Sequence, residues 1–266
     1  MSVVCVIPAR YASSRFPGKP LVPISGATGQ GQTLIERVWR VAQTVAEFDR
    51  VVVATDDNRI AEVAAGFGAE VAMTSDAAQN GTERCGEVLA QLATAPEMIV
   101  NLQGDAPLTP PAFLSALVAG LRAAPAMDVA TPVLRCDGPT LAALRADRVA
   151  GRVGGTTAVF GADHRALYFS KEVIPFTKPV ADTAAATPVF HHVGVYAYRP
   201  NALASYCALA PGPLEASEGL EQLRFLEHGR AVLCVEVAPG AHPFWEVNNP
   251  EDVARVEDIL RASGQA

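Results

Sequence analysis

Short runs of β-branched residues alternate with amphipathic segments through the first half of the chain. The first run, residues 3–7, is continuous and apolar, as a strand buried on both faces of a parallel sheet is. Similar runs lie at residues 51–55, 70–73, 98–102 and 129–134, and segments with helical spacing separate them at residues 34–39, 60–66, 82–92 and 110–122. This alternation predicts βαβ units, and therefore an α/β fold with a Rossmann-like, mixed and mostly parallel sheet flanked by helices.

The alternation of strand-like and helix-like segments ends near residue 145, beyond which the segments become shorter and irregular. We expect strands at residues 166–170 and 193–198, a helix over 214–228, a strand over 231–237 and a last helix after Pro250, with Asn249 as its N-cap. The Gly- and Gln-rich residues 26–32 are interpreted as a loop insertion. The length predicts a single domain, residues 1–266, with one part over 1–140 and a smaller one over 145–230.

Charge and cysteine usage exclude several classes of protein. The chain has 21 basic and 28 acidic side chains and a net charge of -7, whereas general nucleic-acid binders carry a basic excess. Its five cysteines are dispersed without metal-ligand spacing, which is typical of reduced thiols in the cytosol. Neither a signal peptide nor an apolar run long enough to span a bilayer is evident, so we expect a cytoplasmic protein with no membrane partner.

Three cations follow the first predicted strand within one loop: Arg10, Arg15 and Lys19. Ligands of open α/β sheets bind beyond the carboxyl ends of the strands. Arg holds phosphate oxygens through a planar fork, so this loop predicts a site for a triphosphate. It has neither the Walker A sequence nor the Gly-x-Gly-x-x-Gly of dinucleotide-binding folds.

The sequence alone gives weaker evidence of a functional role for the other candidate residues. Asp105 follows an apolar run and a glycine, a place where a carboxylate suits Mg²⁺, although an aspartate before Pro107 is also a common turn residue. His192, near the start of a predicted strand, is able to donate to a carboxylate or hydroxyl, but a lone histidine is more often structural. Glu221 and Gln222 are neighbours on the predicted helix and do not share one face.

Eight segments, in order along nearly the whole chain, resemble the signature segments of CMP-Kdo synthetases, which transfer CMP from CTP to the sugar acid 3-deoxy-manno-octulosonate (Kdo). The longest is PARYASSRFPGKPL at residues 8–21. The others are residues 54–57, 81–84, 101–105, 167–170, 192–196, 220–224 and 249–252. The resemblance implies the nucleotide-diphospho-sugar transferase type of fold, with residues 1–140 mainly binding CTP and residues 145–230 serving acceptor binding and dimerisation. It also implies a homodimer that pairs through residues 145–200.

The resemblance implies roles for individual residues as well. The catalytic set would be Arg10, Lys19 and Asp105. The nucleotide-binding set would be Pro8, Ala9, Arg10, Ser13, Arg15, Lys19, Gly81, Thr82, Arg84 and Gln103. The acceptor-binding set would be Gln103, Lys171, His192, Tyr196, Glu221 and Gln222, and the metal, Mg²⁺, would be held by Asp105 and the residue at position 248.

Four departures from the family pattern concern the acceptor and the metal. Ala106 replaces a glutamate, Lys171 replaces an arginine, and residues 146–152 lack the usual lysine. Asn248 replaces an aspartate that is a metal ligand in relatives; the amide keeps an oxygen but lacks the charge, which weakens binding of a hard cation.

We therefore expect a Mg²⁺-dependent cytidylyltransferase whose partners are CTP and a small anionic acceptor. Kdo or a similar ulosonic acid is the first hypothesis for the acceptor. Another anionic acceptor, such as a phosphonate, is the second, because losing a carboxylate at position 248 lowers the negative charge facing it. A weakly active CTP-binding paralogue is the third, and metal-dependent turnover distinguishes it from the other two.

Overall fold

The computed structural model describes residues 2–13, 15–153, 155–181, 183–240 and 244–265. Their contacts group the chain into two compact units. The first unit comprises residues 1–115, 199–204 and 239–266, and the second comprises residues 116–198 and 205–238. Two helices run from one unit into the other: α4 (Pro111–Ala123) and α6 (Pro200–Ala208). The expectation of a single domain with two functional parts stays a prediction.

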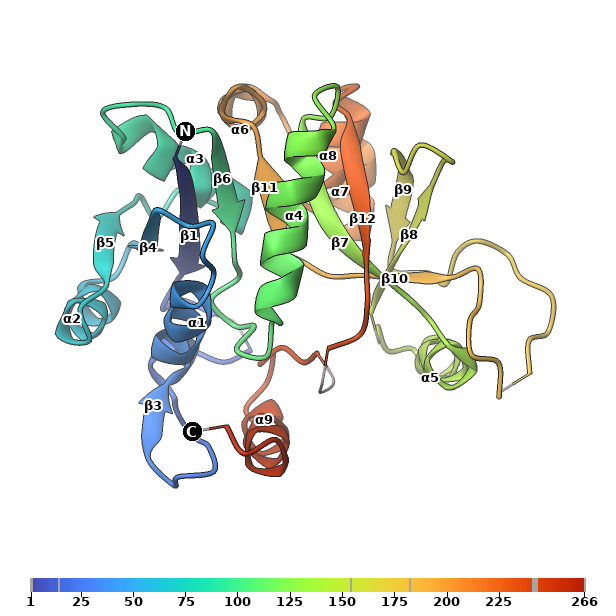
Figure 1. Cartoon of the computed structure of the whole chain (residues 1–266), viewed down its shortest axis with the longest axis horizontal. Helices are drawn as coiled ribbons and strands as arrows, with labels where there is room; N and C mark the ends of the chain where they lie inside the picture. Colours follow the sequence, from blue (N-terminus) through green and yellow to red (C-terminus); the bar gives the residue numbers. More distant parts are fainter. Residues whose placement is uncertain (1, 14, 154, 182, 241–243, 266) are drawn as a thin grey trace. The chain divides into compact units, whose positions relative to one another are not determined.

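The first unit is built around four parallel strands. Their order is β5 (Glu70–Met73), β4 (Arg50–Thr55), β1 (Val3–Ala9) and β6 (Met98–Asn101). The connecting helices are α1 (Leu34–Gln43), α2 (Asn58–Gly66) and α3 (Gly81–Gln91). Figure 1 shows these strands side by side. The predicted βαβ units are confirmed, and they bring the loops after β1 and β6 to the same edge of the sheet.

Local sequence explains where these elements begin. Strand β1 is buried along its whole length, as its continuous apolar run predicts. Thr33 caps α1 by accepting a hydrogen bond from the backbone N–H of Glu36, and Asp57 caps α2 in the same way through Arg59. Asn80 caps α3 through the N–H of Glu83. The first unit also holds a 3-10 turn η1 (Lys19–Leu21) and helix α9 (Asp252–Ala262).

The second unit is mainly antiparallel. Strands β11 (Tyr196–Tyr198) and β10 (Phe190–His192) pair with successive parts of β7 (Val129–Arg135). On its other side β10 pairs with β8 (Thr156–Phe160), and β8 pairs with β9 (Ala166–Ser170). Strand β12 (Val232–Val237) pairs with β7 in parallel. The helices are α5 (Gly138–Val149), α7 (Pro213–Glu218) and α8 (Leu223–Glu227).

Several sequence expectations are wrong in detail. Residues 26–30 form a loop as expected, but residues 31 and 32 belong to β3 (Gly31–Thr33), which pairs with β2 (Pro23–Ser25) in a hairpin. Helix α5 and strand β8 were not expected. The predicted strand over 193–198 is interrupted because the Thr131 hydroxyl is hydrogen-bonded to the carbonyls of Val193 and Val195. Helix α9 begins at Asp252, later than predicted, with Glu251 rather than Asn249 at its N-cap position.

The predicted helix over 214–228 is two helices. Gly219, at φ 62°, ends α7 in the left-handed conformation, which glycine adopts without steric cost. As a result Glu221 and Gln222 lie in the turn between α7 and α8 rather than on a helix.

None of the five cysteines, all of them among the described residues, forms a disulfide. Four are buried and Cys207 is exposed, so the expectation of core thiols holds for all but that one. Among the described residues, no helix has the length and apolar character needed to cross a membrane.

Candidate active site

The loop after β1 is folded into a compact turn around Tyr11. The backbone N–H groups of Ser13 and Gly18 both donate to the Tyr11 carbonyl at 3.0 Å. Gly18 has a φ of 72°, and a Cβ there would lie 3.1 Å from the Tyr11 ring. The Arg59 guanidinium lies 3.3 Å from the centre of the same ring. The turn therefore requires glycine at position 18, and helix α2 supports it through Arg59.

The predicted cations of this loop meet the predicted metal residues. Lys19 donates from Nζ to Asp105 Oδ2 at 2.7 Å, and the two side chains are 13% and 27% exposed. Arg15 donates to the amide oxygen of Asn248 at 3.1 Å. Arg10 is exposed at the start of the loop. Residues far apart in the sequence thus form one cluster in the first unit, in which cationic side chains contact carboxylate and amide oxygens.

Close backbone packing brings Asp105 to this cluster. The N–H of Leu102 donates to the Val6 carbonyl at 3.0 Å, which continues the pairing of β6 with β1. A Cβ at Gly104 would lie only 2.6 Å from the carbonyl oxygen of Pro8, so the chain before Asp105 passes directly against the end of β1. The side chain of Ala106 is 1% exposed, so it packs into the core at this point.

Glu246 lies in the same cluster, although the sequence analysis missed it. The N–H of Val247 donates to the Asp105 carbonyl at 2.8 Å, which ties this segment to the loop after β6. The Asn248 amide donates to Glu246 Oε2 at 3.5 Å. Burial, and next the charge of Asp105, raise the pKa of Glu246 to about 7, against the opposing effect of the Asn248 hydrogen bond and of Lys19 and Arg15. Its position two residues before Asn248 was the available signal.

The donor set here has the chemistry of a magnesium site. Asp105 and Glu246 offer carboxylate oxygens and Asn248 an amide oxygen, all hard ligands. No group of three or more His, Cys, Asp or Glu side chains suited to a metal occurs within the described part of the chain. Mg²⁺ in nucleotide sites normally takes one or two carboxylates and completes its shell with phosphate and water, so this set is sufficient.

The residues predicted around the nucleotide base lie at the start of α3. A Cβ at Gly81 would lie 2.9 Å from Gln103 Nε2, so the helix start and Gln103 are in close contact. Thr82 is 1% exposed. Arg84 is buried as well, and its guanidinium donates to Asp56 at 3.2 Å, to the Thr74 hydroxyl and to the Ser75 carbonyl. Arg84 therefore ties α3 to the loops after β4 and β5, and a contact of Arg84 with the base stays a prediction.

The second unit gathers three of the predicted acceptor residues. His192 is buried, with Nε2 2.9 Å from the Thr131 hydroxyl, and burial lowers its pKa to about 3, so the ring is neutral. The ring packs edge-on against Phe169 and near Tyr196. The Tyr196 hydroxyl donates to Gln222 Oε1 at 3.1 Å. Gln222 Nε2 is buried, and no partner for it occurs among the described residues.

Lys171 is positioned by Glu218 at the end of α7. Glu218 accepts hydrogen bonds from the Ser170 hydroxyl at 2.6 Å, from the Lys171 N–H at 2.9 Å and from the Tyr168 hydroxyl at 3.4 Å. The Lys171 ammonium lies 3.0 Å from the place a Cβ would occupy on Gly219. Glu218 thereby fixes the backbone from which Lys171 projects.

Arg224, by contrast, has a structural role. Its guanidinium donates to both carboxylate oxygens of Glu215 at 2.7 Å, and it lies over the Tyr206 ring at 4.2 Å. The Tyr206 hydroxyl in turn donates to the Glu221 carbonyl at 3.2 Å. This buried pair joins α7 to α8 and holds the turn that carries Glu221 and Gln222.

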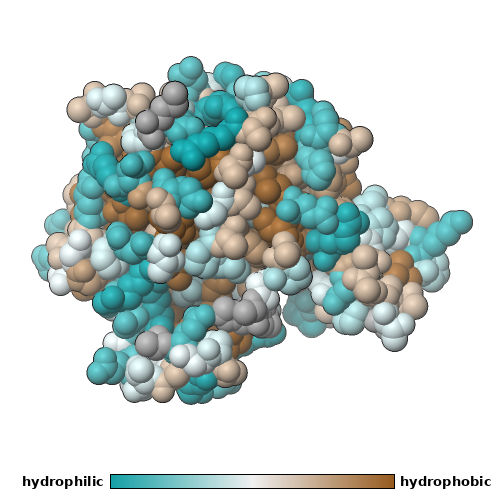
Figure 2. All heavy atoms as spheres, in the orientation of Figure 1, coloured by the Kyte–Doolittle hydropathy of each residue, from teal (hydrophilic) through white to brown (hydrophobic). Residues whose placement is uncertain are grey.

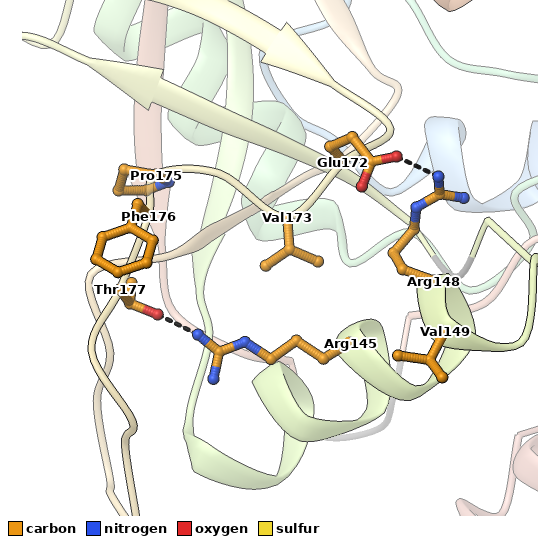
Figure 3. Close-up of a pocket in the computed structure, with 8 residues that line it drawn as sticks. All are labelled: Arg145, Arg148, Val149, Glu172, Val173, Pro175, Phe176 and Thr177. Atoms are coloured by element: carbon orange, nitrogen blue, oxygen red, sulfur yellow. Dashed lines mark hydrogen bonds and ion pairs between the residues drawn. The ribbon is translucent and has the colours of Figure 1, made fainter.

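A separate hollow of about 410 Å³ lies beside α5. Its lining residues, shown in Figure 3, are Arg145, Arg148, Val149, Glu172, Val173, Pro175, Phe176 and Thr177. Arg148 pairs with Glu172, and Arg145 donates to the Thr177 hydroxyl. Val149 and Phe176 are each 91% exposed. Figure 2 shows apolar and polar side chains mixed at the surface over α5.

Comparison with known proteins agrees with this geometry. The profile of the cytidylyltransferase family matches residues 4–232. The chain is 45% identical to a 3-deoxy-manno-octulosonate cytidylyltransferase of Maricaulis maris, over 100% of this chain and 99% of the relative. It is 39% identical to the mitochondrial 3-deoxy-manno-octulosonate cytidylyltransferase of Arabidopsis thaliana, over 97% of this chain and 83% of the relative.

A solved structure is similar over the full length. A CMP:2-keto-3-deoxy-manno-octonic acid synthetase complexed with CTP superposes with a TM-score of 0.82 at 33% identity, covering 99% of this chain and 100% of the other. The expected α/β fold of the nucleotide-diphospho-sugar transferase type, a mixed sheet flanked by helices, is confirmed by this likeness.

Proposed function

This chain belongs to the cytidylyltransferase family, with CMP-Kdo synthetases as relatives over its full length, and on that premise we propose that it transfers CMP from CTP to Kdo and releases pyrophosphate. Its substrates are then CTP and a small anionic sugar acid. The observation that carries the proposal is the contact of Lys19 and Arg15 with Asp105 and Asn248 beside the loop after β1.

The reaction is an in-line displacement at the α-phosphorus of CTP. The anomeric oxygen of Kdo forms the new P–O bond and releases its proton to solvent, while the bond from the α-phosphorus to the bridging oxygen breaks and pyrophosphate leaves with that oxygen. Arg10, Arg15 and Lys19 bind the phosphates and neutralise the charge that develops on them. Pro8, Ala9, Ser13, Gly81, Thr82, Arg84 and Gln103 complete the nucleotide site.

The metal requirement belongs to this proposal. Asp105 and Asn248 would hold Mg²⁺ through hard oxygen donors. When bound, Mg²⁺ supplies charge neutralisation at the phosphates and lowers the pKa of an acceptor hydroxyl.

Acceptor binding is assigned to the second unit. Gln222 supports this assignment, because its buried Nε2 is an amide donor that a sugar hydroxyl or carboxylate would satisfy. Tyr196 orients that amide, and His192, held by the Thr131 hydroxyl, contributes a neutral ring rather than a charge. Lys171, held by Glu218, and Glu221 complete the set.

The test is pyrophosphate release from CTP and Mg²⁺ with a panel of acceptors. We expect Kdo to give the highest kcat/KM, with other ulosonic acids and simple phosphonates weaker. If a phosphonate gives a higher kcat/KM than Kdo, the second hypothesis, an anionic acceptor other than a sugar acid, is favoured instead. Binding of CTP without metal-dependent turnover on any acceptor would indicate a weakly active paralogue.

We further propose a cytoplasmic homodimer that pairs through residues 145–200. Support comes from the apolar side chains that α5 and the segment after β9 present to solvent, above all Val149 and Phe176. Apolar surface of this kind is covered in stable symmetric dimers.

A further inference from the structure

Glu246 lies two residues before position 248, where this chain has an asparagine in place of the carboxylate of the family pattern. Val247 between them is fully buried, and its N–H donates to the Asp105 carbonyl at 2.8 Å. This bond fixes the segment beside the Asp105 loop. The hydrogen bond from the Asn248 amide to Glu246 Oε2, at 3.5 Å, places both side chains on the same side of the chain. Whatever faces Asn248 therefore also faces Glu246.

Two cations, Lys19 and Arg15, lie close to the acidic groups of this cluster. Lys19 is bonded to Asp105 at 2.7 Å, and Arg15 is bonded to the Asn248 oxygen at 3.1 Å. Both cations act on Glu246 electrostatically, as does the charge of Asp105. One carboxylate from the loop after β6 and one from residues 244–249 thus face the same small region of the first unit.

We propose that Glu246 supplies the second carboxylate of the divalent-cation site, together with Asp105, in place of the aspartate that position 248 lacks. This inference rests on the proposed function. A glutamate has one methylene more than an aspartate, so it reaches further from its backbone position. Two carboxylates match the charge of Mg²⁺, whereas one carboxylate and one amide leave the cation half neutralised before the phosphates arrive.

The assignment changes the interpretation of the acceptor site. The hypothesis of a re-tuned acceptor depended on a loss of negative charge at position 248. With Glu246 beside Asn248 the cluster keeps two carboxylates. The charge facing the acceptor is then that of an ordinary Kdo enzyme, and Asn248 serves as a neutral ligand or as the donor that orients Glu246.

The experiment measures Mn²⁺ binding directly, with Mn²⁺ as a paramagnetic probe in the presence of CTP and without acceptor, so that no turnover occurs. Electron paramagnetic resonance of free Mn²⁺ gives the dissociation constant. We expect Glu246→Gln to raise that constant at least tenfold. The matched control is Glu251→Gln, which removes the same charge from an exposed side chain five residues along the chain.

A rescue variant separates a ligand from a structural residue. Glu246→Gln combined with Asn248→Asp returns a carboxylate to the site two residues away, and we expect Mn²⁺ affinity to recover to within about threefold of wild type. The inference is overturned if Glu246→Gln binds Mn²⁺ as tightly as wild type, or if it is weakened and the double variant stays equally weak while circular dichroism shows both folded.

Failure of this inference is distinguishable from failure of the proposed function. A wild-type protein that forms CMP-Kdo while Glu246→Gln keeps full Mn²⁺ affinity contradicts the role of Glu246 alone. A wild-type protein that binds neither CTP nor Mn²⁺ contradicts both.

Discussion

Two of the cations that we propose for phosphate binding already have polar partners: Lys19 pairs with Asp105, and Arg15 donates to Asn248. Lys19 and Asp105 are both largely shielded from solvent, so their attraction is screened less than that of a surface ion pair. A triphosphate would offer these cations further anionic oxygens without moving the backbone, because the Gly18 turn and the Gly104 contact fix both loops. Preorganised charge of this kind lowers the cost of reorganisation in the transition state.

Replacing the loop cations tests this role. Arg10→Ala and Lys19→Ala should each cost about 2–4 kcal/mol of transition-state stabilisation, measured as the loss of kcat/KM for CTP, because each removes a charged donor to a developing anion. Arg40→Ala is the matched control, since Arg40 pairs with Glu36 on the surface of α1. Unchanged kcat/KM in both loop variants would exclude the phosphate assignment.

The raised pKa of Glu246 predicts how stability depends on pH in the metal-free protein. The pKa of about 7 in the folded state lies above the ordinary glutamate value of 4.5, so the native state binds more protons than the unfolded state between these pH values. The free energy of unfolding should therefore fall as the pH rises from 5 to 8, by about 2 kcal/mol. Urea unfolding of wild type and Glu246→Gln checks this, and an equally steep fall in the variant would contradict it.

Helices and strands were predictable where the apolar pattern of their own residues matches the faces that are buried. The buried parallel strands and the capped helices of the first unit follow from continuous apolar runs and from Thr33 and its equivalents. The second unit was harder, because its structure depends on contacts that are distant in sequence. Thr131 interrupts a strand more than sixty residues away, and the Arg224 pair with Glu215 sets the turn at Gln222. Glu246 was not predicted because the family pattern marks position 248 and not position 246, and only the folded chain brings Glu246 to Asp105.

Gly18 and Gly29 offer a matched test of the loop turn. Both have a φ near 72°, but a Cβ at Gly18 would contact the Tyr11 ring, whereas nothing lies within 4 Å at Gly29. Both alanine variants should lose about 1–2 kcal/mol of stability through backbone strain. Only Gly18→Ala should also weaken CTP binding, by roughly tenfold, as measured by isothermal titration calorimetry. Equal CTP affinity in the two variants would contradict the role of the Tyr11 turn.

The whole chain divides the proposed work between its two units. The first holds the loop cations, the proposed metal ligands and the start of α3, on parallel strands whose loops converge at one edge. The second holds the buried His192 and Gln222 and the exposed apolar residues beside α5. We therefore assign both acceptor recognition and assembly to the second unit.

Assembly is open to a direct measurement. Light scattering at micromolar concentration should give twice the mass of the 27.9 kDa chain. Phe176→Glu, which places a charge on the exposed apolar surface, should shift the equilibrium to the monomer. Met73→Glu is the control, because Met73 is an exposed apolar residue of the first unit. A wild-type mass equal to one chain would contradict the dimer.

The hydrogen bond of Val247 to Asp105 has a consequence for the evolution of this sequence. The side chains at positions 246 and 248 contact each other beside the Asp105 loop. An acidic residue at either position therefore lies among the same neighbouring residues. Descendants of one ancestor can therefore exchange the acidic position by two substitutions, passing through a sequence with both acids, while the chain trace stays the same. A comparison made column by column records a vanished aspartate in such a lineage, whereas a comparison made in space records none.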